Sequence, residues 1–312
     1  MGAMATGYAP GKVILCGEHA VVYGRPAIAV PVTEVQARAT VEPARDGWGV
    51  EIDAPDLNRR LALREAGDGD PLARIVRLAL QAMDVQGEPD LRIMVTSTVP
   101  IARGMGSGAA VSTAIVRALA GHYGRWLSSR DVSDLVYQTE LIYHGTPSGI
   151  DNTVVAFEKP VYFVKDVSCE IFWVGRPFLL AIADTGIDSP TREVVGDLRR
   201  RYRADPGSHE PLFDRAGQIA VEARAAIERG EAEALGPLLD ENHALLQALG
   251  VSRPELDRLV VAAREGGAWG AKLSGAGWGG NMIALVTDQT KSRVDLALRL
   301  AGAVRVIITE VK

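Results

Sequence analysis

A glycine-rich loop between a strand pattern and a helix pattern constrains the fold of this 312-residue chain more than any other stretch. It lies within VPIARGMGSGAAVSTAIVRAL, residues 99–119, where Pro100 ends an apolar run and small apolar residues recur at helical spacing after the loop. Such a loop presents unpaired backbone N–H groups and the positive end of a helix dipole, which together favour a phosphate group. The glycines at alternating positions are Gly104, Gly106 and Gly108.

The composition is that of an ordinary globular chain, long enough for two domains. Hydrophobic residues make up 47% and charged residues 23%, and the net charge of −5 argues against nucleic acid or an anionic membrane as the main partner. No apolar run reaches membrane-spanning length and the N-terminus carries no signal pattern, so we expect a cytoplasmic protein. Two cysteines, Cys16 and Cys169, cannot form a disulfide framework or a thiolate metal site.

The order of strand and helix patterns predicts an α+β fold with two domains, residues 1–178 and 179–312. We expect a turn at residues 146–152, TPSGIDN, and a second glycine loop at residues 272–280, KLSGAGWGG. Strands are predicted at 13–15, 27–30, 91–98, 282–286 and 304–309, with further strands within 33–64 and 161–185. Helices are predicted at 71–83, 109–119, 129–144, 191–203, 212–229, 231–249, 254–265 and 292–303.

The first glycine loop also fits two other interpretations. Gly104, Gly106 and Ala109 satisfy the dinucleotide pattern G-x-G-x-x-A, but the loop does not follow a strand directly and the next acid, Asp131, opens a helix. Alternatively, the glycines merely pack against a helix. The loop alone therefore does not decide between a phosphate site and a packing role.

Single charged residues are equally ambiguous. Lys12 lies in an apolar strand context, where a lysine is costly unless its charge is paired or used, although a surface lysine with a buried stem is the ordinary alternative. Glu18, Glu140 and Asp151 taken singly are ordinary solvated or capping acids, and His19 is by default a loop or core histidine. Their combination carries the argument.

Three blocks, in order along the chain, resemble the GHMP family of small-molecule kinases, which comprises galactokinases and homoserine, mevalonate and phosphomevalonate kinases. The blocks are APGKVILCGEHAVVYG from residue 9, PIARGMGSGAA from residue 100 and KLSGAGWGG from residue 272. Within this family, GEHAVVYGRPAIA and HGTPSGIDN, residues 144–152, resemble the mevalonate kinase branch. The resemblance implies a ribosomal protein S5-like N-terminal α/β domain that binds ATP, a ferredoxin-like C-terminal α+β domain, and a site in the cleft between them.

The resemblance also implies roles for single residues. Asp151 matches the catalytic acid that takes the proton from the C5 hydroxyl of mevalonate, and Lys12 matches the lysine beside it. The positive charge of Lys12 would favour an alkoxide-like nucleophile and keep Asp151 ionised. Glu18, His19 and Thr185 match positions at the mevalonate end of the site.

ATP and Mg²⁺ are the cofactors that the resemblance implies. Glu140 matches a magnesium-binding carboxylate, as suits a hard cation. The family loop usually reads GLGSSAA, so Gly108 replaces a serine that helps to bind magnesium, which leaves Ser107, a water or Glu140 alone to hold the ion. The residues expected to bind ATP are Pro100, Gly104, Met105, Gly106, Ser107, Gly108, Ala109 and Ala110.

The function implied is therefore an ATP- and magnesium-dependent mevalonate kinase of the isoprenoid pathway, with mevalonate as the small-molecule substrate and a homodimer as the expected assembly. One alternative is a related kinase that acts on phosphomevalonate or another small alcohol. A second is a catalytically silent ligand sensor, against which the joint presence of Lys12, Glu140 and Asp151 argues. Release of ADP separates a kinase from a sensor.

Overall fold

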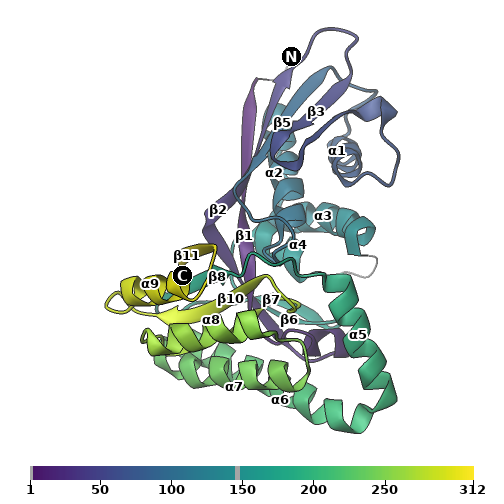
Figure 1. The fold of residues 1–312 in the computed structure, drawn as a ribbon. Helices are drawn as coiled ribbons and strands as arrows, with labels where there is room; N and C mark the ends of the chain where they lie inside the picture. The colour runs from purple at the N-terminus through teal and green to yellow at the C-terminus, as the bar shows by residue number, and fades with distance from the viewer. Residues whose placement is uncertain (1–2, 145–147) are drawn as a thin grey trace. The chain divides into compact units, whose positions relative to one another are not determined.

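The computed structural model describes residues 3–144 and 148–312, and the chain divides into two compact units (Figure 1). Unit 1 comprises residues 1–11, 35–100 and 106–158, and unit 2 comprises residues 12–34, 101–105 and 159–312. The chain therefore passes between the units several times, and the first glycine loop begins in unit 2 and ends in unit 1. Both units combine strands with helices, as the α+β prediction requires.

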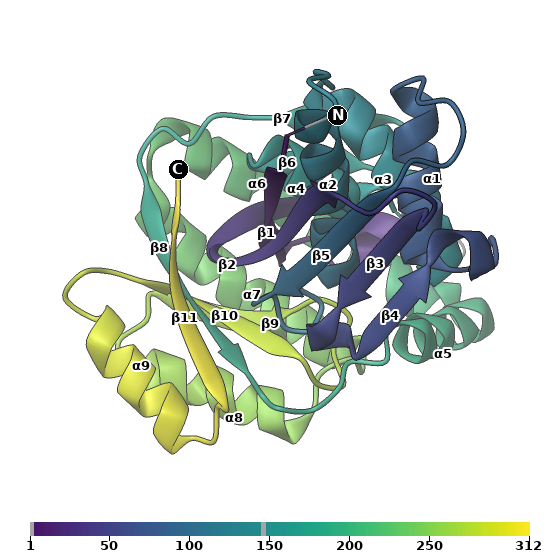
Figure 2. The same ribbon diagram turned by 90° about the horizontal axis from the view of Figure 1, so that it is seen from above.

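Unit 1 holds a sheet with the strand order β4-β3-β5-β2, which Figure 2 shows for β4, β3 and β5 side by side. Strands β3 and β5 are parallel, whereas β3 with β4 and β2 with β5 are antiparallel. Strand β1 also pairs with β2. The bounds are β1 Ala5–Cys16, β2 Ala27–Pro43, β3 Val50–Ala54, β4 Arg59–Ala62 and β5 Leu91–Ser97. Short 3₁₀ turns are η1 Ala20–Tyr23, η2 Pro55–Leu57 and η3 Leu63–Glu65.

The helices of unit 1 pack on one another, and α2 also contacts strand β5. Helix α1 begins where the sequence predicts because the Asp70 side chain accepts hydrogen bonds from the N–H groups of Leu72 and Ala73, at 2.9 and 3.1 Å. Its first residue is Pro71, whose missing N–H costs nothing there. The bounds are α1 Pro71–Ala82, α2 Ser107–His122, α3 Ser129–His144 and α4 Ile150–Phe157.

Helix α4 corrects the expectation of a turn at residues 146–152. It begins at Ile150 after Gly149, which has a left-handed φ of 89°. Serine and glycine before the helix gave a turn signal, and an eight-residue helix offers too little periodicity to outweigh it. Residues 145–147 of the HGTPSGIDN block lie outside the described residues.

Unit 2 contains an antiparallel sheet with the order β11-β8-β10-β9, covered on one face by helices α7, α8 and α9 (Figures 1 and 2). Helix α6 packs on α7, and the hairpin of β6 and β7 extends the β2 edge. The strands are β6 Val161–Val164, β7 Ser168–Ile171, β8 Phe178–Asp184, β9 Gly270–Ser274, β10 Asn281–Val286 and β11 Arg305–Val311. The helices are α5 Thr191–Ala204, α6 Pro206–Arg229, η4 Ala232–Ala234, α7 Leu235–Ala248, α8 Pro254–Glu265 and α9 Lys291–Leu300.

Strand β2 is a single strand of 17 residues, where the sequence predicts a short strand at 27–30 and separate alternating segments. The strand contains Pro31, which has no N–H to donate and would normally interrupt the hydrogen bonds of a strand. It is tolerated because it lies between the stretch 27–29 that pairs with β6 and the stretch 37–43 that pairs with β5. No helix in the described part of the chain is long and apolar enough to cross a membrane.

Candidate active site

The polar turn after β1 brings a buried acid against a buried lysine. Gly17 has a φ of 88° and a Cβ there would lie 2.4 Å from the carbonyl oxygen of Pro26, so the turn requires glycine. The next residue, Glu18, is 1% exposed and its Oε1 pairs with Nζ of Lys272, which is fully buried. Burial raises the pKa of Glu18, although the nearby ammonium of Lys272 acts in the opposite direction. The turn thus contains one member of a desolvated ion pair, Glu18, whose partner is Lys272.

His19 is held in a strained and neutral state in the same turn. Its φ of 61° and ψ of −49° lie in a region that residues other than glycine rarely adopt. Its Nε2 lies 2.8 Å from the carbonyl oxygen of Ala276, and because a carbonyl only accepts, Nε2 carries the proton. Burial lowers the pKa of His19 to about 4, so the imidazole is neutral at pH 7. The sequence predicted that His19 lies at the mevalonate end, but it did not predict which nitrogen carries the proton.

The late glycine loop begins as a strand, which corrects its predicted start. Lys272 to Ser274 are the end of β9 and are buried, and the loop proper starts at Gly275. The Ser274 hydroxyl accepts a hydrogen bond from the N–H of Ile14 at 3.2 Å and donates one to the Ile14 carbonyl at 2.8 Å. The strand is short and runs into glycines, which conceals it in the sequence.

The first half of the first glycine loop approaches the late loop closely. A Cβ on Gly104 would lie 3.9 Å from the Cα of Gly275, and both glycines have left-handed φ values, 76° and 94°. The N–H of Lys12 donates to the carbonyl of Met105 at 3.0 Å, which ties the opening strand to the same loop. Lys12 itself is 3% exposed, so it is not the surface lysine of the alternative interpretation. Met105 is also buried.

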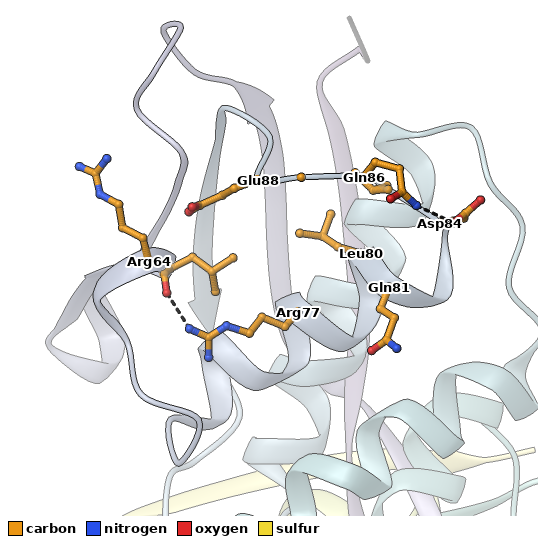
Figure 3. A pocket seen from close by; sticks show the side chains of 10 residues that line it. Arg64, Arg77, Leu80, Gln81, Asp84, Gln86 and Glu88 are labelled. Carbon is orange, nitrogen blue, oxygen red and sulfur yellow. Dashed lines mark hydrogen bonds between the residues drawn. The ribbon is translucent and has the colours of Figure 1, made fainter.

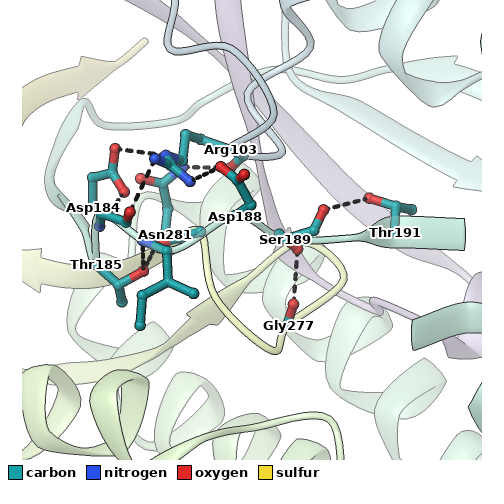
Figure 4. A network of polar contacts seen from close by, with 11 residues as sticks. Arg103, Asp184, Thr185, Asp188, Ser189, Thr191, Gly277 and Asn281 are labelled. Atoms are coloured by element: carbon teal, nitrogen blue, oxygen red, sulfur yellow. Dashed lines mark hydrogen bonds and ion pairs between the residues drawn. The ribbon is translucent and has the colours of Figure 1, made fainter. Parts of the chain in front are cut away.

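Arg103 fixes this loop to the end of β8, as Figure 4 shows. Its Nε lies 3.3 Å from Oδ2 of Asp184, its NH1 pairs with Asp188 at 2.5 Å, and its NH2 donates to the carbonyl of Gly186 at 3.1 Å. Its own carbonyl accepts from Nδ2 of Asn281 at 2.6 Å. Arg103 was not predicted as a site residue, because a single arginine in a loop does not indicate in the sequence that it will contact three partners.

Thr185 and Trp278 complete the contacts on this side. The Thr185 hydroxyl donates to the carbonyl of Gly280 at 2.8 Å, so it joins β8 to the late loop. Trp278 has a φ of 56°, and its Nε1 donates to the carbonyl of Gly250 at 3.2 Å. The guanidinium of Arg253 lies 5.3 Å from the Trp278 ring, a cation–π contact. Trp278 therefore contacts the segment between α7 and α8.

In unit 1, the second half of the first glycine loop is the N-terminus of α2. Gly106, with a φ of 70°, precedes the helix, and Ser107 is its first residue. Ala109 and Ala110 are buried, so their side chains serve packing and their backbone alone can face a ligand. The free N–H groups of a first helical turn are the anion-binding feature that the sequence predicts here.

Two acids predicted for the site lie on neighbouring helices of unit 1. Glu140 is on α3 and is 3% exposed, whereas Asp151 is in the first turn of α4 and is partly exposed. Asn152 ties α4 to α3, because its Nδ2 donates to the Ser133 carbonyl at 3.1 Å and to the Ser133 hydroxyl at 2.9 Å. The first turn of a helix favours a negatively charged side chain, and Asp151 lies there.

The part of the chain that the structure describes contains no metal site made of protein side chains alone. Within residues 3–144 and 148–312, no three His, Cys, Asp or Glu side chains gather in a way that could hold an ion. Mg²⁺ commonly binds one or two carboxylates together with substrate phosphates, and a single carboxylate such as that of the buried Glu140 meets that smaller requirement. The residues are thus compatible with a magnesium ion carried by ATP.

A cavity of about 430 Å³ lies elsewhere in unit 1, at the end of α1 (Figure 3). Several of its polar groups are already bonded within the wall: Arg77 donates to the Leu63 carbonyl at 2.8 Å, and Gln86 donates to Asp84 at 2.8 Å. The described residues that line it include none of the predicted site residues. Its chemistry does not point to a reaction.

Comparison with known families matches two parts of the chain. Residues 72–159 match the GHMP kinases N terminal domain, and residues 223–303 match the GHMP kinases C terminal domain. Together they include the N-terminus of α2, helices α3 and α4, and strand β9 with the late loop.

Relatives and solved structures extend the similarity over nearly the full length. A mevalonate kinase of Pyrococcus furiosus is 35% identical, with 97% of this chain and 95% of that protein covered. A mevalonate kinase of Aeropyrum pernix is also 35% identical, with 90% and 88% covered. Among solved structures, L. major mevalonate kinase in complex with R-mevalonate has a TM-score of 0.85 at 28% identity, covering 98% of this chain and 95% of that one.

Proposed function

This chain belongs to the GHMP kinase family, and on that premise we propose that it transfers the γ-phosphoryl group of ATP to the C5 hydroxyl of mevalonate, giving 5-phosphomevalonate and ADP. The observation that carries the proposal is the 35% identity to a mevalonate kinase over 97% of the chain. The contacts among the three family blocks within unit 2 support it.

We assign the chemical step to Asp151, with Lys12 as its partner. The C5 oxygen attacks the γ-phosphorus as Asp151 accepts the hydroxyl proton, and the bond to the β,γ-bridging oxygen of ATP breaks. The position of Asp151 in the first turn of α4 supports an ionised base. The low exposure of Lys12 supports a charge that is used rather than solvated.

We assign the ATP phosphates to the loop that includes Gly104 and the N-terminus of α2. Phosphoryl transfer depends chiefly on positioning and on neutralising the oxygens of the transferred group, which backbone N–H groups and the helix dipole provide. When bound, Mg²⁺ would neutralise charge on the phosphates. Glu140 and Ser107 are the residues that we propose to hold it, since Gly108 has no side chain to contribute.

We assign mevalonate to Glu18, His19 and Thr185. A neutral histidine has one donor and one acceptor nitrogen. The Nε2–H of His19 already donates to the Ala276 carbonyl, so Nδ1 is the nitrogen that can accept a hydrogen bond from mevalonate. A cytoplasmic location and a homodimer are further proposals, which rest on the family resemblance.

ADP release tests the proposal directly. The purified protein is given magnesium-ATP with mevalonate, phosphomevalonate, homoserine or galactose in separate reactions, and selective turnover of mevalonate is expected. Turnover of another alcohol would replace the substrate and keep the chemistry. Nucleotide binding without any turnover would instead support the sensor.

Asp151→Asn tests the base. Loss of a general base typically costs about 10²- to 10⁴-fold in rate, so kcat should fall at least about 100-fold while nucleotide affinity stays within a factor of about three. Asp131→Asn is the matched control, because Asp131 is an exposed acid in the first turn of α3. Near-normal turnover by Asp151→Asn would show that another group takes the proton.

A further inference from the structure

Lys272 is a buried charge that the proposed chemistry does not use. It lies on β9 with no exposed surface, and its Nζ contacts Oε1 of Glu18, a residue 254 positions earlier in the chain. Its Nζ also donates to the Leu273 carbonyl at 2.6 Å. Both partners of the pair are therefore fully removed from water.

Alternate residues along β9 and its continuation hold the opening segment. Lys272 pairs with Glu18, the Ser274 hydroxyl bonds to the backbone of Ile14, and the Ala276 carbonyl accepts from His19. Alternate residues of a strand point to the same face, so the side chains of Lys272 and Ser274 lie on one face of β9, and the Ala276 carbonyl adds a third contact from the loop that follows. The ion pair is the first of these contacts along the chain.

Stability alone gives no reason for this ion pair. The cost of removing two charges from water commonly equals or exceeds their attraction, and a buried apolar pair of similar volume is often as stable. The carboxylate of Glu18 is moreover incompletely used: among the described residues no donor meets hydrogen-bond geometry at its buried Oε2, although the backbone N–H groups of Glu18 and Gly275 lie close enough to the carboxylate to lower its pKa. A buried acceptor left open costs free energy, which a ligand with a hydroxyl donor can recover.

We propose that Lys272 is a positioning residue for the alcohol substrate: it keeps Glu18 a carboxylate and fixes Oε1, so that Oε2 stays open to a donor on the substrate. The proposal rests on the proposed function, which puts Glu18 at the mevalonate end. Lys272 does not touch the reacting atoms. Its effect passes through Glu18, so its loss weakens substrate binding more than the chemical step.

Three variants test this role: Lys272→Met, Glu18→Gln with Lys272→Met, and Lys291→Met as the control. Lys291 is a lysine on α9 with 40% exposure, paired with Asp288. We expect Lys272→Met to lower the melting temperature and to raise KM for mevalonate about 10- to 100-fold, the range for a lost hydrogen bond to a charged group. KM for ATP should change less than about threefold, and the control should match wild type.

The double variant separates positioning from stability. It leaves no unpaired buried charge, so we expect it to regain most of the melting temperature while KM for mevalonate stays high. Recovery of KM together with melting temperature would overturn the proposal, because the pair would then be structural only. An unchanged KM in a folded Lys272→Met variant would overturn it too.

Failure of the proposed function gives a different result. A wild-type protein that turns over another alcohol removes mevalonate from the proposal, and the same KM comparison is then made with that alcohol. A wild-type protein that turns over none of the four alcohols overturns both proposals. The variants thus test Lys272 only against an activity that the wild type has shown.

Discussion

The two glycine loops of unit 2 are anchored by ionic contacts that differ in burial. The late loop depends on Lys272 and Glu18, whose side chains are 0% and 1% exposed. The first loop depends on Arg103, 18% exposed, which contacts Asp184 at 10% and Asp188 at 81%. We call the pair of Lys272 and Glu18 the dry anchor, because both side chains are shielded from water. We call the contacts of Arg103 the partly solvated anchor, because they lie partly in solvent.

This difference in burial shows how ion pairs can anchor one loop rigidly and another loop loosely. An exposed ion pair contributes little, at a median of about 0–1 kcal/mol, and it can break and reform at low cost. A buried pair contributes little net stability while intact, yet breaking it leaves a charge in a dry environment and is expensive. We therefore expect the ionic contact of the late loop to be rigid, whereas the first loop can adjust if phosphates bind where we propose.

The largest expected effect comes from breaking the dry anchor. Glu18→Ala leaves Lys272 buried without its partner, and we expect the free energy of unfolding to fall by about 3–5 kcal/mol. Urea denaturation at neutral pH measures this change. It should depend little on added salt, because buried charges are weakly screened. A loss below about 1 kcal/mol would show that water reaches Lys272.

The pH dependence of stability probes the same dry environment through His19. Its pKa falls from 6.5 in the unfolded chain to about 4 in the folded one, so the unfolded state binds more protons between these values. Stability from neutral His19 is therefore complete above pH 6.5 and is lost as pH falls toward 4, by at most about 3 kcal/mol. His19→Gln should show a shallower decline over this window in denaturation experiments.

His209→Gln is the control for that experiment, because His209 is a partly exposed histidine on α6. Burial also lowers the pKa of His243 to about 4, but His243 is present in both proteins and cancels in the difference. Identical pH profiles for wild type and His19→Gln would mean that His19 is solvated, and the contrast between the two anchors would weaken.

The sequence predicted the long amphipathic helices because their apolar residues repeat at helical spacing. Helix α8 spans Pro254–Glu265 as expected, and α1 ends within one residue of its predicted end. Strand β9 and helix α4 were missed because each is short and has glycine at one end. Local pattern thus identified the helices of ten residues or more and the short strands β5, β10 and β11, but it predicted the long strands β1 and β2 only in short pieces.

The candidate site also has parts that the sequence predicted and parts that it did not. Family motifs pointed to Glu18, His19 and Thr185, but the contacts that hold them join residues far apart in sequence, such as Glu18 with Lys272 across 254 positions. No periodicity encodes such a pairing. Lys272 gave one signal, a lysine between apolar neighbours in AKLS, while Arg103 in a polar loop gave none. The roles of the predicted site residues stay predictions until the variants are measured.

The smallest expected effects come from the partly solvated anchor. Arg103→Ala removes the contacts to Asp184, Asp188 and the Gly186 carbonyl, and we expect a loss of about 1–2 kcal/mol in the free energy of unfolding. Asp188→Asn removes only the exposed partner and should cost less than about 1 kcal/mol. Urea denaturation of both variants at low and high salt provides the measurement.

Salt dependence decides whether the two anchors differ in kind. Added salt screens exposed charges, so the loss caused by Asp188→Asn should shrink at high ionic strength, while that caused by Glu18→Ala should not. If Arg103→Ala also cost 3–5 kcal/mol independently of salt, Arg103 and Asp184 would form a second dry pair. The first loop would then be as rigidly anchored as the late one, and any adjustment at the proposed phosphate site would have to come from the N-terminus of α2.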